Sequence, residues 1–171
     1  MLRSWMDAGE FVVAAQSPSS SGNGEISASA RIGAEIPRVL HALAVPEYME
    51  AWLQVPDAER IECRSDPRSF DRFRIDLFAA GRRRGCIYGS CLLTKPNRIT
   101  YLWDSTINEG ARSLVEIRLW GCLSRCTLKL QHSGLITRDE REWYSRMWRD
   151  SLHKLCSLME GTGARSAPDL C

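Results

Sequence analysis

His132 is the side chain of this sequence best suited to proton transfer, because imidazole titrates near neutral pH. It follows Leu128 and Leu130 at alternate positions, which is the period of a half-buried strand. We therefore expect His132 on the inner face of that strand, near the start of the following helix. Two roles fit: a general acid or base in a pocket, or a structural histidine hydrogen-bonded to backbone, and the second is favoured. His41 and His153 lie on predicted helices with no motif around them.

Asp104, Glu116 and Arg118 form a second group of candidate chemical residues. Turned inward, they would line a polar pocket suited to enolate or carboxylate chemistry. However, Glu116 and Arg118 alternate with the apolar positions of 115–119, so an outward, solvated ladder of charges is favoured. No Ser/His/Asp pattern, phosphate-binding glycine loop or dinucleotide fingerprint is present. His132 is therefore the one candidate for a catalytic role.

The cysteines do not have the spacing of a metal site. There are seven of them, an odd number, and no CxxC pair occurs. Cys122 and Cys126 lie across a predicted turn with His132 further along, but zinc would need a second tight pair of ligands. We expect no metal and no cofactor. Buried free thiols in a reducing cytoplasm explain the pattern, so a cytoplasmic location is expected.

Composition indicates a soluble globular domain with an ordinary core. The chain has 171 residues, of which 44% are hydrophobic and 26% charged, with a net charge of +2,. Its arginines mostly alternate with acids, so no nucleic-acid partner is expected. The compact run 82–84 is interpreted as a solvated hairpin tip, with a phosphate or acidic partner as the alternative. No apolar segment is long enough to cross a membrane, and Asp7 and Glu10 interrupt what would be the apolar core of a signal peptide.

The sequence divides into three parts. Residues 1–24 are expected to be an N-terminal extension, with a short helix or extra strand near Phe11, followed by a Ser/Gly-rich flexible linker,. Residues 25–160 carry the hydrophobic periodicity of a single domain. Residues 161–171 lack an apolar period and are expected to be a disordered tail.

Within the domain, the periodicity predicts a strand, two short helices, an antiparallel meander and a long helix. The strand covers 26–36, and prolines suited to a first helical turn stand at Pro37 and Pro46,. About six strands follow between 59 and 133. The final helix covers 137–160, and its apolar stripe consists of Tyr144, Trp148, Ser151, Leu152, Leu155 and Met159,.

Three motifs at matching spacing point to a known fold. A strand and short helix followed by a Pro…Trp element occupy 30–53, and a Pro-x-Arg-Ile-x-Tyr-x-Trp hairpin occupies 96–103. A Thr-x-Leu-x-Leu-x-His-Ser-Gly strand occupies 127–135, before a helix carrying Trp148. Over 26–160 the chain resembles the START/Bet v 1-like (SRPBCC) superfamily, and within it the branch of the activator of Hsp90 ATPase.

The sequence departs from that branch at two positions. Where that branch often has an aromatic residue in the first helix, this sequence has Leu40. Where the branch has a glycine before the tryptophan of the final helix, it has Met147. The resemblance implies an α+β helix-grip fold: a curved antiparallel sheet of about six to seven strands around a long C-terminal helix, with two short helices after the first strand. An internal cavity is expected between sheet and helix.

The expected cavity would be lined by residues on the inner faces of these elements. Aromatic rings are good walls for an apolar ligand, although they are equally ordinary core residues. The candidate pocket residues are Trp52, Phe73, Tyr101, Trp103, Leu130, His132, Met147 and Trp148.

The superfamily includes lipid, hormone and polyketide binders, cyclases, hydrolases and co-chaperone modules, so three functions are carried forward. The first is binding of a small hydrophobic molecule without defined catalysis. The second is a co-chaperone-like interaction that stimulates a chaperone ATPase. The third is a cyclase- or hydrolase-like enzyme using His132. A monomer or homodimer is compatible with each.

Overall fold

The computed structural model describes residues 12–16, 24–66, 68–106, 112–122 and 124–161. Eight strands form a single antiparallel sheet in the spatial order β1-β2-β8-β7-β6-β5-β4-β3. The strands are β1 (Val12–Gln16), β2 (Gly24–Ile32), β3 (Arg60–Asp66), β4 (Ser69–Ala79), β5 (Arg82–Lys95), β6 (Arg98–Ser105), β7 (Ser113–Cys122) and β8 (Arg125–Leu135).

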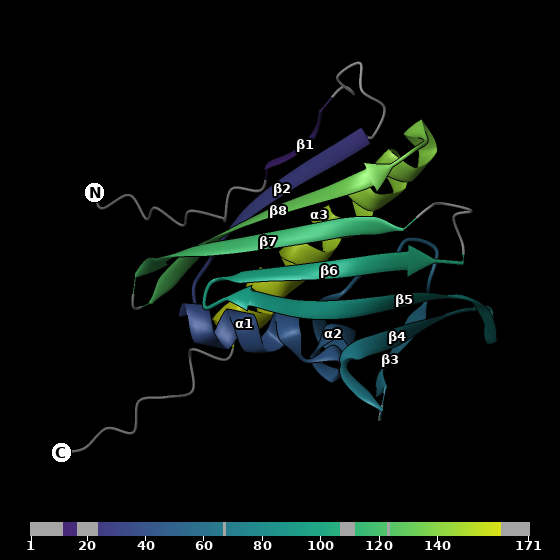
Figure 1. Cartoon of the computed structure of the whole chain (residues 1–171), viewed down its shortest axis with the longest axis horizontal. Coiled ribbons are helices and arrows are strands. Elements are labelled where there is room, and N and C mark those ends of the chain that lie inside the picture. Colours follow the sequence, from purple (N-terminus) through teal and green to yellow (C-terminus); the bar gives the residue numbers. More distant parts are fainter. Residues whose placement is uncertain (1–11, 17–23, 67, 107–111, 123, 162–171) are drawn as a thin grey trace, which may run out of the picture.

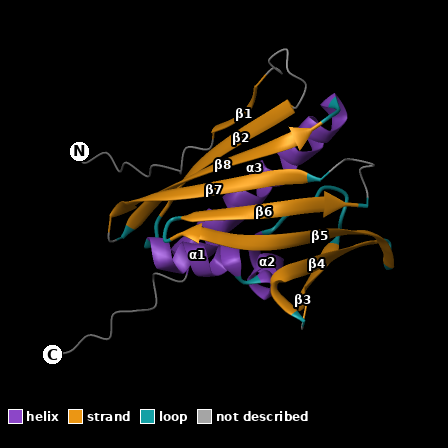
Figure 2. Ribbon diagram, in the orientation of Figure 1, coloured by secondary structure: helices purple, strands orange, loops and turns teal. Residues whose placement is uncertain are grey.

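The helices are α1 (Ile36–Ala44), α2 (Pro46–Trp52) and α3 (Arg138–Gly161). All three lie on one side of the curved sheet, and α3 passes behind it (Figure 1). Figure 2 shows the resulting two layers, a sheet and a helical layer, which is the α+β helix-grip fold expected from the sequence. In the described part of the chain, none of the helices has an apolar stretch long enough to cross a bilayer.

The two short helices begin where prolines allow them to. Pro37 and Pro46 each stand in a first turn, where the missing N–H removes no helical hydrogen bond. The indole Nε1 of Trp52 donates to the carbonyl of Ala42 at 2.9 Å, which joins the end of α2 to α1. A buried tryptophan N–H thus satisfies a buried carbonyl between the two helices.

The long helix α3 starts at a reciprocal cap. The backbone N–H of Glu140 donates to Thr137 Oγ1 at 3.1 Å, and the Glu140 carboxylate accepts from the backbone N–H of Thr137 at 3.0 Å. This is the capping box encoded by Thr-x-x-Glu. The cap fixes where the helix begins, and hence which of its residues face the sheet.

The predicted alternation is present along the strands. On β6 the odd-numbered residues 99–105 are buried and the even-numbered ones are more exposed, and β7 continues this pattern. The buried face packs against the apolar stripe of α3, including Tyr144, Trp148 and Leu155. We call this the inner face and the other the outer face.

Several expected boundaries are wrong. The strand predicted over 26–36 ends at Ile32. The run 82–84 is not a hairpin tip, because it belongs to β5 and the turn consists of Ala80 and Gly81, with φ of 52° and 68°. The register shifts between Leu77 and Phe78 of β4, which pair with Gly85 and Arg83, so Arg84 is the extra residue of a bulge in β5,.

The sheet also has more strands than the six to seven expected. β1 comes from the segment interpreted as an extension, and it pairs with β2. Of the two expectations for the region near Phe11, a short helix or an extra strand, residues 12–16 form the strand. The linker over 17–23 and the tail over 162–171 lie outside the described residues.

Gly89 occupies a position on β5 where a side chain would not fit. It pairs with Phe73 on β4 and with Trp103 on β6. A Cβ atom at this position would collide with the ring of Phe73, which is itself buried against Tyr101 and Trp103. Glycine here therefore lets a large ring cross the strand.

We expect Gly89→Ala to destabilise the fold by about 1–3 kcal/mol, because the ring of Phe73 must leave its packed position. Urea unfolding should show the loss, and Phe73→Leu in the same chain should recover part of it. The matched control is Gly161→Ala, where no atom lies within 4 Å of the added Cβ. Equal stability changes in the two single variants would contradict this packing.

Candidate functional site

Four aromatic rings meet between the sheet and α3. Trp103 lies at the centre, with centroid distances of 5.8 Å to Phe73, 6.2 Å to Tyr101 and 5.6 Å to Trp148. The rings are tilted or perpendicular to one another, which is the favourable arrangement for their quadrupoles. We call these four residues the aromatic cluster. It joins β4 and β6 to α3.

A chain of hydrogen bonds lies next to the aromatic cluster. Trp148 Nε1 donates to His132 Nδ1 at 3.0 Å, and His132 Nε2 lies 2.8 Å from Ser113 Oγ. The tryptophan can only donate, so the histidine proton is on Nε2 and is donated to the serine. Ser113 Oγ in turn donates to the carbonyl of Trp103 at 3.4 Å. The chain links α3, β8, β7 and β6.

His132 is neutral in this environment. Its side chain is fully buried, and desolvation lowers its pKa from the ordinary value to about 3,. Both ring nitrogens are engaged with protein groups, and the ring of Tyr144 packs edge-on at 4.4 Å. This geometry favours the structural interpretation of His132, although its partners are side chains and not the expected backbone.

The remaining candidate pocket residues are buried but play different parts. Leu130 and Met147 are fully buried on β8 and α3. Tyr101 Oη donates to the carbonyl of Leu43 at 2.5 Å, which ties β6 to α1. Trp52 is bonded within the α1–α2 pair and makes none of the cluster's ring contacts. Ring contacts and hydrogen bonds thus join Phe73, Tyr101, Trp103, His132 and Trp148, whereas Trp52, Leu130 and Met147 belong to the same buried core without these contacts.

Trp103 carries the one indole N–H among the described residues that is buried without an acceptor. The residue is 1% exposed. A buried donor left unpaired costs about 1–3 kcal/mol. Buried polar groups in native folds are nearly always hydrogen-bonded, so this N–H is a candidate donor to a bound molecule.

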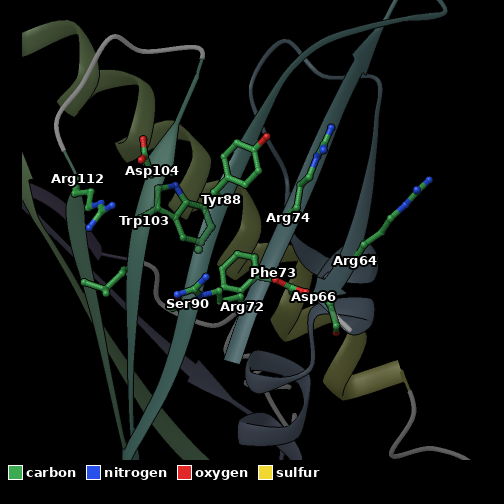
Figure 3. A pocket seen from close by; sticks show the side chains of 13 residues that line it. Arg64, Asp66, Arg72, Phe73, Arg74, Tyr88, Ser90, Trp103, Asp104 and Arg112 are labelled. Atoms are coloured by element: carbon green, nitrogen blue, oxygen red, sulfur yellow. The ribbon is translucent and has the colours of Figure 1, made fainter. Parts of the chain in front are cut away.

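A separate pocket of about 600 Å³ opens on the outer face of β3 to β6. Phe73, Gly89 and Trp103, which pair across the strands, lie at its floor. Most of its other lining residues alternate with the buried ones and thus point away from α3. Figure 3 shows these side chains across the strands, from Arg64 on one side to Arg112 on the other.

The charged candidates of β6 and β7 point outward, as expected. Glu116 forms ion pairs with Arg98 and Arg118 on the outer face, and Asp104 is exposed at the edge of the outer pocket. Among the described residues, no group of three or more His, Cys, Asp or Glu side chains could hold a metal ion.

Sequence reasoning did not include Ser113 or Tyr144 in the site. Tyr144 could have been found, because it stands four residues before Trp148 on the same helical stripe,. Ser113 carried no comparable signal, since its role depends on the pairing of β7 with β6 and β8.

The architecture matches solved structures, whereas the sequence alone matches neither a protein-family model nor a curated protein. Protein CV1439 from Chromobacterium violaceum is 22% identical, with a TM-score of 0.64 over 85% of this chain and 99% of that one. A START superfamily protein from Mycobacterium smegmatis is 10% identical, with a TM-score of 0.63 over 81% and 98%. The chain has the START-like helix-grip fold.

CalU16 from Micromonospora echinospora has the same architecture, at 21% identity and a TM-score of 0.60 over 92% of this chain and 90% of that one. At such identities the likeness concerns the fold alone. None of these three structures is described as an activator of Hsp90 ATPase, so the resemblance to that branch remains a prediction.

The low pKa of His132 predicts acid-sensitive stability. In the unfolded chain the imidazole binds a proton below its ordinary pKa of 6.5, whereas in the fold it stays neutral down to about 3. Stability should therefore be full above pH 6.5 and fall as pH drops through this window, by about 1.4 kcal/mol per unit. Urea unfolding between about pH 7.5 and 5.5 measures this slope, above the range where carboxylates titrate.

His132→Gln should remove this slope, because the amide can still accept from Trp148 and donate to Ser113 without titrating. His41→Gln, at an exposed position, serves as the matched control and should keep it. An unfolding free energy of the unmodified protein that does not change over the window would contradict a neutral His132.

Proposed function

We propose that the protein binds a small, uncharged, largely apolar molecule between the curved sheet and α3, at the aromatic cluster. The observation that carries the proposal is the buried indole N–H of Trp103, which has no acceptor among the described residues. A carbonyl or hydroxyl oxygen of a ligand would supply the missing partner and recover the cost of the unpaired donor.

The surroundings of Trp103 indicate what kind of molecule fits. Its ring neighbours are Phe73, Tyr101 and Trp148, which offer apolar and aromatic surface. The nearby polar chain through His132 is neutral and internally satisfied. A charged ligand would lose its hydration without gaining a counter-ion here, so an uncharged molecule is favoured.

The START-like fold supports the same class of ligand, because that superfamily includes binders of lipids, hormones and polyketides. All eight candidate residues are at most 3% exposed, so the rings pack against one another. Binding is therefore expected to reorient rings of the aromatic cluster, instead of filling a rigid preformed space. His132 is neutral and both of its ring nitrogens are hydrogen-bonded, so it gives no support to acid–base catalysis at this site.

Progesterone and naringenin are suitable probes, since each combines an apolar body with a carbonyl acceptor. We expect saturable binding of at least one by isothermal titration calorimetry and native mass spectrometry. Trp103→Phe keeps the ring but removes the donor, and should weaken binding about tenfold, the value of one buried hydrogen bond.

The matched control is Trp120→Phe, because Trp120 is 48% exposed on the outer face. The same chemical change there should leave the affinity unaltered. The proposal fails if neither probe binds the unmodified protein, or if both variants weaken binding to the same extent.

A further inference from the structure

The outer pocket lies across the sheet from α3, although Phe73 and Trp103 of the aromatic cluster form part of its lining. It is lined by two aspartates, Asp66 and Asp104, and by four arginines, Arg64, Arg72, Arg74 and Arg112. Two of the four arginines pair with carboxylates beside the pocket, Glu62 and Asp76. An arginine without such a partner in a concave, partly desolvated site attracts anions, because the field is concentrated there.

Two of these arginines have no counter-ion among the described residues. Arg64 and Arg74 are each held by a neighbouring carboxylate, at 2.9 Å and 2.7 Å. By contrast, neither Arg72 nor Arg112 has an ion-pair partner within the described part of the chain. Their guanidinium groups are the cations that an added anion would meet.

The surface between these two arginines combines apolar side chains with the hydroxyl groups of Ser90 and Tyr88. Arg72 pairs across the strands with Ser90, and Ser90 with Leu102. Tyr88 and Leu102 are 44% and 40% exposed, which is high for large apolar side chains on a sheet. The Arg74 guanidinium lies over one face of the Tyr88 ring, at 5.6 Å from the centroid. A flat apolar body can lie on the exposed surface of Tyr88 and Leu102 beside it.

The spacing of the arginines sets the size of the ligand. Arg72 is on β4 and Arg112 stands just before β7. Three strand spacings separate β4 from β7, so the two backbones lie roughly 14 Å apart. Long arginine side chains can reach inward over that span (Figure 3). The pocket volume of about 600 Å³ is also that of a site for a small molecule,.

We propose that this outer pocket is a second binding site, which takes a small anionic molecule with a flat apolar body. The anionic group, a carboxylate or sulfonate, pairs with Arg72 or Arg112, and the apolar body lies over Tyr88 and Leu102. This site differs from the interior site, which favours uncharged molecules and lies on the other face of the sheet, although Phe73 and Trp103 border both.

Naphthalene-2-sulfonate tests this site, with 2-naphthol as its uncharged counterpart. We expect the sulfonate to perturb the amide signals of Tyr88, Ser90 and Leu102 in NMR titrations, and to bind about tenfold more tightly than the naphthol. Arg72→Ala and Arg112→Ala should each weaken sulfonate binding severalfold, and so should raising the salt to about 0.5 M. Arg146→Ala, an exposed arginine on α3, should not.

Equal binding of the two naphthalenes, an absence of saturable sulfonate binding, or equal effects of all three arginine variants would each overturn the proposal. A hexaglutamate peptide that binds more tightly than the sulfonate would also overturn it, by making the pocket a docking site for acidic segments. The two sites are tested separately, because Arg72→Ala should weaken sulfonate binding but leave progesterone and naringenin binding unchanged.

Discussion

The hydrogen-bonded chain from Trp148 through His132 and Ser113 to the Trp103 carbonyl connects the long helix to three strands of the sheet. Each group in it has a defined role as donor or acceptor, so the chain fixes the rotation of α3 and the tilt of its tryptophan. The aromatic cluster depends on that tilt. Without it, the Trp148 ring could not close the cluster over Trp103, and the position of the unpaired indole N–H would not be defined.

The sheet to which this chain is anchored has two chemically different faces. The interior holds neutral groups, because His132 stays uncharged near neutral pH and both of its ring nitrogens are hydrogen-bonded. The outer face holds ion pairs, and also two arginines that have no ion-pair partner in the described part of the chain. Gly89 lies between the two, where the sheet lacks a side chain and only the ring of Phe73 fills the space. The same sheet therefore has an apolar inner face and an outer face with arginines that can attract anions.

The fold could be predicted from the sequence because side-chain period reports which face a residue occupies. The alternation of β6 and β8 and the stripe of α3 placed the aromatic residues and His132 correctly on the inner face. Ser113 and the outer pocket could not be predicted in this way, because they depend on the register between strands. The run 82–84 shows this limit. β5 extends to Arg82 through a bulge at Arg84, and the side-chain period alone does not reveal bulges,.

The indole N–H signal of Trp103 in a ¹H–¹⁵N spectrum tests the central claim most directly. The signal can be assigned with the Trp103→Phe variant, and followed as progesterone or naringenin is added. We predict that the Trp103 proton moves downfield as it acquires an acceptor, while the signal of the exposed Trp120 stays in place. A Trp103 signal that does not respond while the ligand binds would contradict an interior site at the aromatic cluster.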